Sequence, residues 1–215
     1  MQRNLLRFPV AACLLLFAMR GMADANVIVN GSFEQPDISS GGTYETFTAG
    51  DTGILGWTVF GQSVDIVSGG SYGGAAAGSQ MLDLDGTPGP GGVMQAFATN
   101  PGTEYAFSFA YRRSGRSATV SLLDSSGDLV TPISIAGSSD WVTFADTFIA
   151  REGTTILKFL SNTSSGNDGL YLDAVSVVAT SAVVPEPGSL ALLACGGLGI
   201  VGGWVRKRRS AVAAA

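Results

Sequence analysis

Carboxylates are the side chains of this chain with the most scope for chemistry. The 215 residues include 17 aspartates and glutamates but no histidine, and both cysteines, Cys13 and Cys195, lie in apolar runs near the two ends. The absence of histidine excludes Ser-His-Asp and Cys-His catalysis, and the segment 26–183 lacks both residue types that zinc sites mainly use. An enzyme built on this segment would depend on carboxylates, hydroxyls, tyrosine or lysine.

Two of these carboxylates alternate with leucines along one predicted strand. Asp83 and Asp85 share one face of it, and Leu82 and Leu84 share the other. The aspartates could hydrogen-bond sugar hydroxyls, or act as the acid and base of a glycoside hydrolase. Hydrolysis needs two carboxyl groups that face each other across the scissile bond, about 5–10 Å apart, and neighbours on one strand rarely do so. The simpler interpretation is a polar strand face, and we expect no enzyme activity.

Aromatic and basic side chains supply further candidates for ligand binding. Trp57 and Trp141 could each stack on a sugar ring, although packing at the end of a β-sandwich is the simpler expectation. The cluster of Arg112, Arg113 and Arg116 could bind an acidic polysaccharide. Most such clusters are solvated loop charges, and this is the alternative interpretation.

The charge of the segment 26–183 limits its partners. Fifteen acidic and five basic side chains give it a net charge of −10. A segment this acidic repels the phosphates of nucleic acids, so nucleic acid is excluded as a partner. Divalent cations and neutral molecules suit it better.

Short apolar runs separated by turn signals indicate how these residues are positioned. No part of the segment 26–183 shows a sustained period of 3.6 residues, so strands are expected rather than helices. Many short strands with regular turns predict an all-β fold, an antiparallel sandwich or barrel. The expected strands cover 27–29, 56–60, 64–67, 80–84, 93–98, 104–112, 117–123, 133–135, 142–150, 154–161 and 170–178.

The clearest of these strands has four aromatic residues on one face. They alternate with alanine and serine and are Tyr105, Phe107, Phe109 and Tyr111. We expect the aromatic face to fill the core between two sheets, and the small-residue face to lie toward solvent or a shallow cleft. The alternative is a platform that stacks on a ligand.

A secretory signal peptide is predicted at the N-terminus. Arg3 and Arg7 precede an apolar run over 8–19, and an Ala-Asp-Ala sequence ends at Ala25. This order of a basic region, an apolar region too short to span a bilayer, and a small-residue site predicts cleavage after Ala25. Residues 1–25 are therefore expected to be removed on export.

Three consecutive segments form the C-terminal tail. A Pro-Glu-Pro sequence precedes an uncharged apolar run over 190–205, which is followed by four basic residues at 206–209. The apolar run predicts a C-terminal transmembrane helix, and the basic residues place 210–215 in the cytoplasm by the positive-inside rule. The motif residues are Val184, Pro185, Glu186, Pro187 and Gly188.

This tail, 184–209, resembles the PEP-CTERM sorting signal of Gram-negative bacteria in the order and position of all three segments. The resemblance implies export across the inner membrane, a transient anchor in that membrane, and processing by an exosortase. It further implies that the protein then reaches the cell surface or the extracellular matrix.

The exported segment resembles a second family. It opens with Val-Asn-Gly-Ser-Phe-Glu at 29–34 and closes with Leu-Tyr-Leu-Asp-Ala-Val-Ser-Val at 170–177. Matching sequences between these ends lie at 54–59, 63–67, 80–86 and 93–97. The order is similar to that of galactose-binding-like domains among carbohydrate-binding modules, in a bacterial subfamily with interchangeable C-terminal anchors. The resemblance implies an antiparallel jelly-roll β-sandwich over 26–183.

The same resemblance implies a structural calcium ion. In those modules a glutamate of the first strand and an aspartate of the last strand often hold it, and here these residues are Glu34 and Asp173. Backbone carbonyls near Asn30 and Gly31 would have to complete the shell of oxygen ligands. The alternative is that both carboxylates are solvated or hydrogen-bonded to the backbone.

These patterns predict an exported surface or matrix protein that binds polysaccharide without catalysis. The expected partner is the producer's own extracellular polymer. The alternative is a structural or protein-interaction module of the same fold with no sugar site, and a glycoside hydrolase is the third interpretation.

Overall fold

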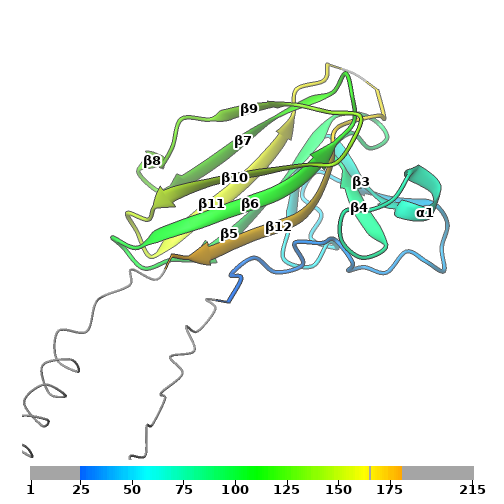
Figure 1. Cartoon of the computed structure of the whole chain (residues 1–215). Helices are drawn as coiled ribbons and strands as arrows, with labels where there is room; N and C mark the ends of the chain where they lie inside the picture. The colour runs from blue at the N-terminus through cyan, green and yellow to red at the C-terminus, as the bar shows by residue number, and fades with distance from the viewer. Residues whose placement is uncertain (1–24, 165, 181–215) are drawn as a thin grey trace, which may run out of the picture. The chain divides into compact units, whose positions relative to one another are not determined.

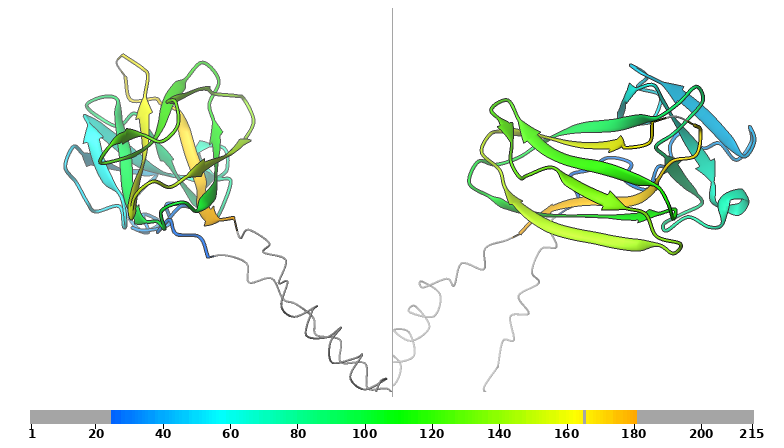
Figure 2. Two further views of the ribbon diagram at one scale, coloured as in Figure 1. Left: turned by 90° about the vertical axis from the view of Figure 1, so that its left-hand side faces the viewer. Right: turned by 90° about the horizontal axis from the view of Figure 1, so that it is seen from above.

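Two antiparallel sheets pack face to face in the computed structural model, which describes residues 25–164 and 166–180 (Figures 1 and 2). In order across the first sheet, the strands are β1 (Tyr44–Thr48), β3 (Ser63–Ser68), β4 (Gln80–Asp83), β12 (Tyr171–Ala179), β6 (Glu104–Arg112) and β10 (Val142–Ile149). The second sheet contains β2 (Thr58–Gly61), β5 (Gly91–Ala98), β11 (Thr154–Ser161), β7 (Ser117–Asp124) and β8 (Gly127–Asp128), with β9 (Ile133–Ala136) also paired to β7. The predicted all-β sandwich is confirmed.

Apolar side chains from both sheets fill the space between them. Alternation along β6 directs Tyr105, Phe107 and Phe109 into this core, as the sequence predicts. Phe109 meets Phe159 of β11 nearly edge to face, with ring centroids 5.0 Å apart. Such contacts between large rings across the sandwich stabilise the pairing of the two sheets.

The segment before β1 lies along β12 and is not a strand, although the sequence predicts one at 27–29. Its attachment is by hydrogen bonds, from the N–H of Val27 to the carbonyl of Val177 at 2.9 Å and from Val175 to Gly31 at 2.8 Å. A Cβ atom on Gly31 would lie only 2.0 Å from the carbonyl oxygen of Val175. This close approach of two backbones requires glycine.

Two elements near β3 were not predicted from the sequence, β1 and the short helix α1 (Gly69–Tyr72). β1 is an edge strand in which only Phe47 is buried, so it lacks the apolar alternation that indicates a strand. α1 is a single turn that ends at Gly73 in the left-handed conformation, with φ of 88°. A turn this short has no apolar period of its own.

Among the described residues, no helix is long and apolar enough to cross a membrane. The predicted signal peptide 1–25, apart from Ala25 itself, lies outside the described residues, as do the sorting motif 184–188, the apolar run 190–205 and the basic residues that follow it.

The chain divides into a unit Met1–Ala179 and a second unit Thr180–Ala215. Both sheets and both hydrophobic clusters of the described residues belong to the first unit. The segment 26–180 therefore carries its own core and is expected to fold as an isolated domain.

Candidate ligand-binding site

A small apolar cluster lies on the outer face of the first sheet, opposite the main core. Val67, Met81 and Tyr171, from β3, β4 and β12, form this outer cluster and are all buried. They face outward because the residues that alternate with them on each strand face the main core. The half-buried side chains that cover the outer cluster are Tyr72, Ala75 and Trp141.

The loop between β3 and β4 surrounds an open hollow of about 680 Å³. None of its eight lining residues is charged, and five are glycines. Because glycine has no side chain, backbone N–H and C=O groups form much of the wall and can hydrogen-bond a neutral polar ligand. The lining residues are Ser68, Gly69, Gly70, Gly73, Gly74, Ala75, Gly78 and Ser79.

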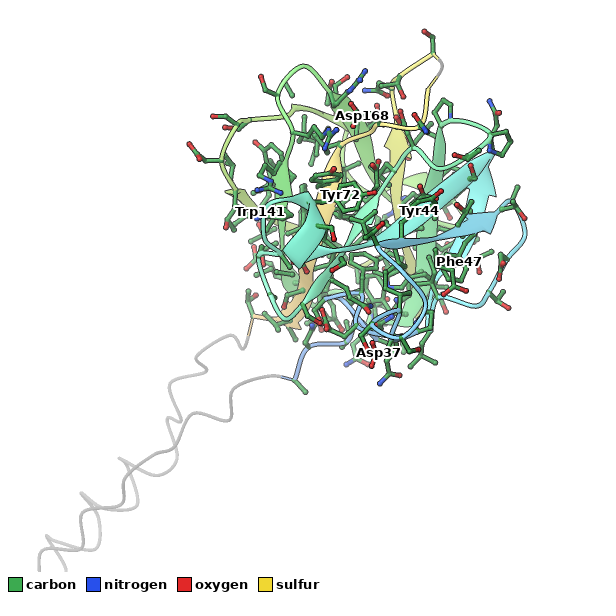
Figure 3. The ribbon with its side chains drawn as sticks, turned by 90° about the vertical axis from the view of Figure 1, so that its right-hand side faces the viewer. Asp37, Tyr44, Phe47, Tyr72, Trp141 and Asp168 are labelled. Carbon is green, nitrogen blue, oxygen red and sulfur yellow. The ribbon has the colours of Figure 1, made fainter. Side chains whose placement is uncertain are left out.

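Aromatic side chains lie on both sides of this hollow. Trp141 precedes β10, and its indole N–H donates to the carbonyl of Gly74 at 3.0 Å. Tyr44, which is 52% exposed, lies opposite Val67 in the β1–β3 ladder. Figure 3 shows Trp141, Tyr72 and Tyr44 in this order across one face. Trp141 and Tyr44 thus reach the hollow from opposite edges of the first sheet, so an extended ligand can contact aromatic rings on both sides of it.

Arg112 attaches the loop to the sheet. Its guanidinium lies 5.0 Å from the ring centroid of Trp141 and 5.5 Å from that of Tyr171. Its two terminal nitrogens donate to the carbonyls of Gly73 at 2.8 Å and Tyr72 at 2.6 Å. Arg112 thus positions the hollow and its aromatic wall, and its hydrogen bonds go to the protein itself.

Arg113 and Arg116 are bound to the same acidic side chain. Both form ion pairs with Asp168, and Arg113 also donates to the hydroxyl of Tyr171. Burial raises the pKa of Tyr171 to about 12, so its hydroxyl stays protonated at neutral pH. Asp168 thus offsets part of the positive charge of this arginine cluster, which is a candidate for binding an acidic polysaccharide.

Asp83 and Asp85 do not form the solvated polar face expected of their strand, because they are 4% and 0% exposed. Oδ1 of Asp83 accepts the N–H groups of Asp85 at 3.0 Å and Gly169 at 2.8 Å, and the hydroxyl of Thr163 donates to Asp85. Burial raises the pKa of Asp83 to about 8. Alternation predicts which face the aspartates share, but it cannot show that other segments cover that face.

Glu34 and Asp173 hold the other end of the loop. The carboxylate of Glu34 accepts the backbone N–H groups of residues 79–80 at 2.9 and 2.8 Å. Asp173 accepts those of residues 76–77 at 2.7 and 2.8 Å. Burial raises the pKa of Asp173 to about 6, and the nearby charge of Glu34 adds to this shift.

The hydrogen-bond partners of Glu34 and Asp173 do not fit a calcium site. Calcium takes about six to eight oxygen ligands, whereas the oxygens of Glu34 and Asp173 face N–H groups and the hydroxyl of Ser79, at 2.7 Å from Glu34. Within 25–164 and 166–180, no three acidic, histidine or cysteine side chains gather closely enough to hold a metal ion. The contacts match the alternative, hydrogen bonding to the backbone, and calcium is a prediction for chelation to test.

Trp57 lies in the main core and takes no part in the outer face. It is 1% exposed, its ring centroid lies 5.3 Å from that of Phe33, and its N–H donates to the carbonyl of Asn30 at 3.2 Å. The structure therefore separates the two tryptophan candidates, and only Trp141 is placed to contact a ligand.

Tyr44 and Tyr72 belong to the site but were not singled out from the sequence. Each ends a sequence of two glycines and a hydroxyl residue, Gly-Gly-Thr-Tyr and Gly-Gly-Ser-Tyr. Such stretches indicate turns, and a large aromatic residue in a turn has no apolar neighbours in sequence to pack with. This repeated pattern is the signal that could have revealed both residues.

A family model described as "Protein of unknown function (DUF642)" matches residues 26–180, which include both sheets. The chain belongs to the DUF642 family. Its tail matches the PEP-CTERM protein-sorting motif over residues 183–209, which confirms the predicted sorting signal. That motif implies an exported, cell-surface-directed protein that an exosortase processes.

Other relatives of this DUF642 chain differ greatly in length. Halomucin of Haloquadratum walsbyi is 34% identical over 163 residues, which are 73% of this chain but only 2% of halomucin. Among solved structures, TmCBM61 in complex with β-1,4-galactotriose is 16% identical, with a TM-score of 0.49, over 73% of this chain and 99% of that one. A family 16 carbohydrate-binding module is 17% identical, with a TM-score of 0.45, over 71% and 99% of the two chains.

Proposed function

We propose that this DUF642 protein binds polysaccharide at the cell surface or in the extracellular matrix, without catalysis, on a galactose-binding-like sandwich. Its ligand lies in the hollow of the loop between β3 and β4 and stacks on the aromatic residues beside it. The partner in this proposal is the producer's own extracellular polymer, since the PEP-CTERM tail directs the protein to the cell surface.

The observation that carries this proposal is a hollow with a neutral wall between partly exposed aromatic rings. Sugars offer hydroxyl groups to backbone N–H and C=O groups and present apolar faces to aromatic rings. The hollow has no charged lining residue, and Tyr44, Tyr72 and Trp141 lie along the same face. Electrostatic capture of an anionic ligand is not needed for this mode of binding.

Binding without catalysis agrees with the positions of the candidate carboxylates. Asp83 and Asp85 are buried, so a glycosidic bond cannot pass between them as hydrolysis requires. Glu34 and Asp173 accept backbone N–H groups of the loop. Glu34 and Asp173 therefore support the loop around the hollow, Asp83 and Asp85 support the end of β4, and none of the four is placed as an acid–base pair for a substrate.

The alternative is a structural or protein-interaction module with no sugar site. One observation favours this alternative, because Trp141 and Arg112 both donate N–H hydrogen bonds to carbonyl groups of the loop. Tyr44 is the residue whose replacement distinguishes the two functions, because half of its surface is exposed and it lies on the neighbouring edge strand.

Retention of the segment 26–180 on a glycan array and on isolated exopolysaccharide tests the proposal. We expect the segment to be retained, and Tyr44→Ala to weaken retention about three- to tenfold through the loss of one stacking contact. Ile149→Ala is the matched control, because Ile149 is 61% exposed on β10 and should not change retention. Absence of retention on every glycan would overturn the proposal in favour of the alternative.

A further inference from the structure

Two buried aspartates meet at the end of β4, outside the proposed ligand site. Asp83 is the last residue of β4, and Asp85 follows two residues later. A Cβ atom on Gly169 would lie 2.7 Å from Oδ1 of Asp83 and 2.8 Å from Cγ of Asp85. Both carboxyl groups therefore crowd against the same point of the backbone.

One oxygen of this pair has no hydrogen-bond donor. Oδ1 of Asp83 accepts two backbone N–H groups, and Oδ2 of Asp85 accepts the hydroxyl of Thr163. Oδ1 of Asp85 is buried and has no partner among the described residues. A buried acceptor without a donor is destabilising, so we expect a hydrogen-bond donor that these contacts do not include to lie near it.

The charged groups around the pair favour the uptake of a proton. Asp65 of β3 lies opposite Asp83 in the ladder, and burial raises the pKa of Asp65 as well. Arg113 and Arg116 face the pair from the turn after β6, but both are engaged by Asp168. Tyr171 of β12, opposite Asp83, stays neutral. The arginine charges that act on Asp83 and Asp85 are thus shared with a third carboxylate, Asp168.

The pKa of Asp83 agrees with this charge balance. Burial is the main cause of its rise to about 8, and the neighbouring charge of Asp85 adds to it. When two carboxyl groups share a site, one of them keeps its proton well above the ordinary range. A bound proton occupies almost no volume, so it is compatible with the tight packing of both carboxyl groups against Gly169.

We propose that the Asp83 carboxyl keeps its proton and donates an O–H hydrogen bond to the buried Oδ1 of Asp85. The two aspartates hydrogen-bond Thr163 and Gly169 to the end of β4. In alkaline solution the O–H bond of Asp83 breaks, the proton combines with hydroxide to give water, and two adjacent carboxylates remain. Their repulsion then weakens this junction, so the stability of the sandwich depends on pH at the end of β4, beside Tyr171.

Infrared spectroscopy of the segment 26–180 between pH 6 and pH 9.5 tests this pair directly. We expect the band of a protonated carboxylic acid at pH 6, with a loss midpoint near pH 8, well separated from that of Asp173 near pH 6. The part of the band that is lost near pH 8 should be missing in Asp83→Asn and present in Asp65→Asn. A wild-type spectrum without a protonated carboxyl above pH 7, or a band above pH 7 that persists in Asp83→Asn, would overturn the proposal.

The two asparagine variants should also differ in stability. Asparagine at 83 can still accept with its oxygen and donate with its amide, so Asp83→Asn should keep the wild-type melting temperature at pH 6 and lose less of it by pH 9.5. Asp85→Asn should melt lower throughout, because asparagine cannot accept both from residue 83 and from Thr163. Equal melting of Asp85→Asn and wild type at every pH would contradict the pairing.

Discussion

Glu34 and Asp173 are the residues that the sequence predicts to hold a structural calcium ion. Their oxygens already receive backbone N–H groups of the loop around the hollow. We therefore expect a chelator such as EDTA to leave the melting temperature of the segment 26–180 unchanged, and elemental analysis to find no bound calcium. A lower melting temperature after chelation, restored by added calcium, would instead establish the ion predicted from the sequence.

Asp124 and Arg151 give a second prediction at this scale. Arg151 donates to both carboxylate oxygens of Asp124 at 2.9 Å and thereby lowers the pKa of Asp124. A lowered pKa in the folded state contributes stability above the unfolded pKa of about 3.9, and this contribution is lost as pH falls through the folded pKa.

Arg151→Gln should therefore lower the melting temperature more at pH 6 than near pH 2, where only its hydrogen bonds to the carbonyls of Gly127 and Asp128 are still missing. Thermal unfolding followed by circular dichroism over this range measures the difference. Lys158→Gln, which removes another positive charge at a distance from Asp124, is the control. A difference between Arg151→Gln and wild type that is the same at every pH would contradict the linkage.

Residue types were easier to predict than residue positions. The structure brings Trp141, Arg112 and the buried Asp83 to the surroundings of Tyr171, and all three were candidates from the sequence. Trp57 was an equal candidate, yet it lies in the core. One sequence cannot decide which side of a sheet a single tryptophan takes when the residues around it do not alternate.

At the scale of elements, the N-terminal segment is fixed to β12 through Gly31. A Cβ atom there would meet the carbonyl oxygen of Val175 at 2.0 Å, so Gly31→Ala must push two backbones apart. We expect a loss of about 1–3 kcal/mol in the free energy of unfolding, measured by denaturant titration. Gly153→Ala is the control, because no atom lies within 4 Å of its added Cβ. Equal stability of the two variants would show that the N-terminal segment can move away from β12 without lowering the free energy of unfolding.

The strands with strong apolar alternation were predictable from the sequence, and β6 is the clearest of them. β1 and α1 were not, because an exposed edge strand and a single glycine-rich turn gain their structure from contacts with β3 and β4. These two elements carry Tyr44 and Tyr72. The part of the fold that was hardest to predict is therefore the part that forms the candidate site.

At the scale of the whole molecule, the sorting tail determines where the domain acts. Pro185→Ala combined with Pro187→Ala in the full chain should abolish processing by the exosortase, so the protein should stay in the membrane fraction at its uncleaved size. Cell fractionation and immunoblotting measure this. Pro101→Ala, in the exposed turn before β6, is the control and should reach the surface like wild type. Surface delivery of the double variant would show that the motif is dispensable.

The hollow is the proposed place where polysaccharide binds to this protein. Gly70 lines the hollow, and a Cβ there meets only Ser68 Oγ, at 3.7 Å, so Gly70→Leu fills the space without backbone strain. Gly153→Leu adds the same side chain to an open turn elsewhere.

The decisive measurement is the affinity of both variants for the retained exopolysaccharide, determined by affinity electrophoresis of the segment 26–180. We predict at least about a tenfold loss for Gly70→Leu, with wild-type melting, and unchanged affinity for Gly153→Leu. Wild-type affinity of Gly70→Leu would contradict the central claim.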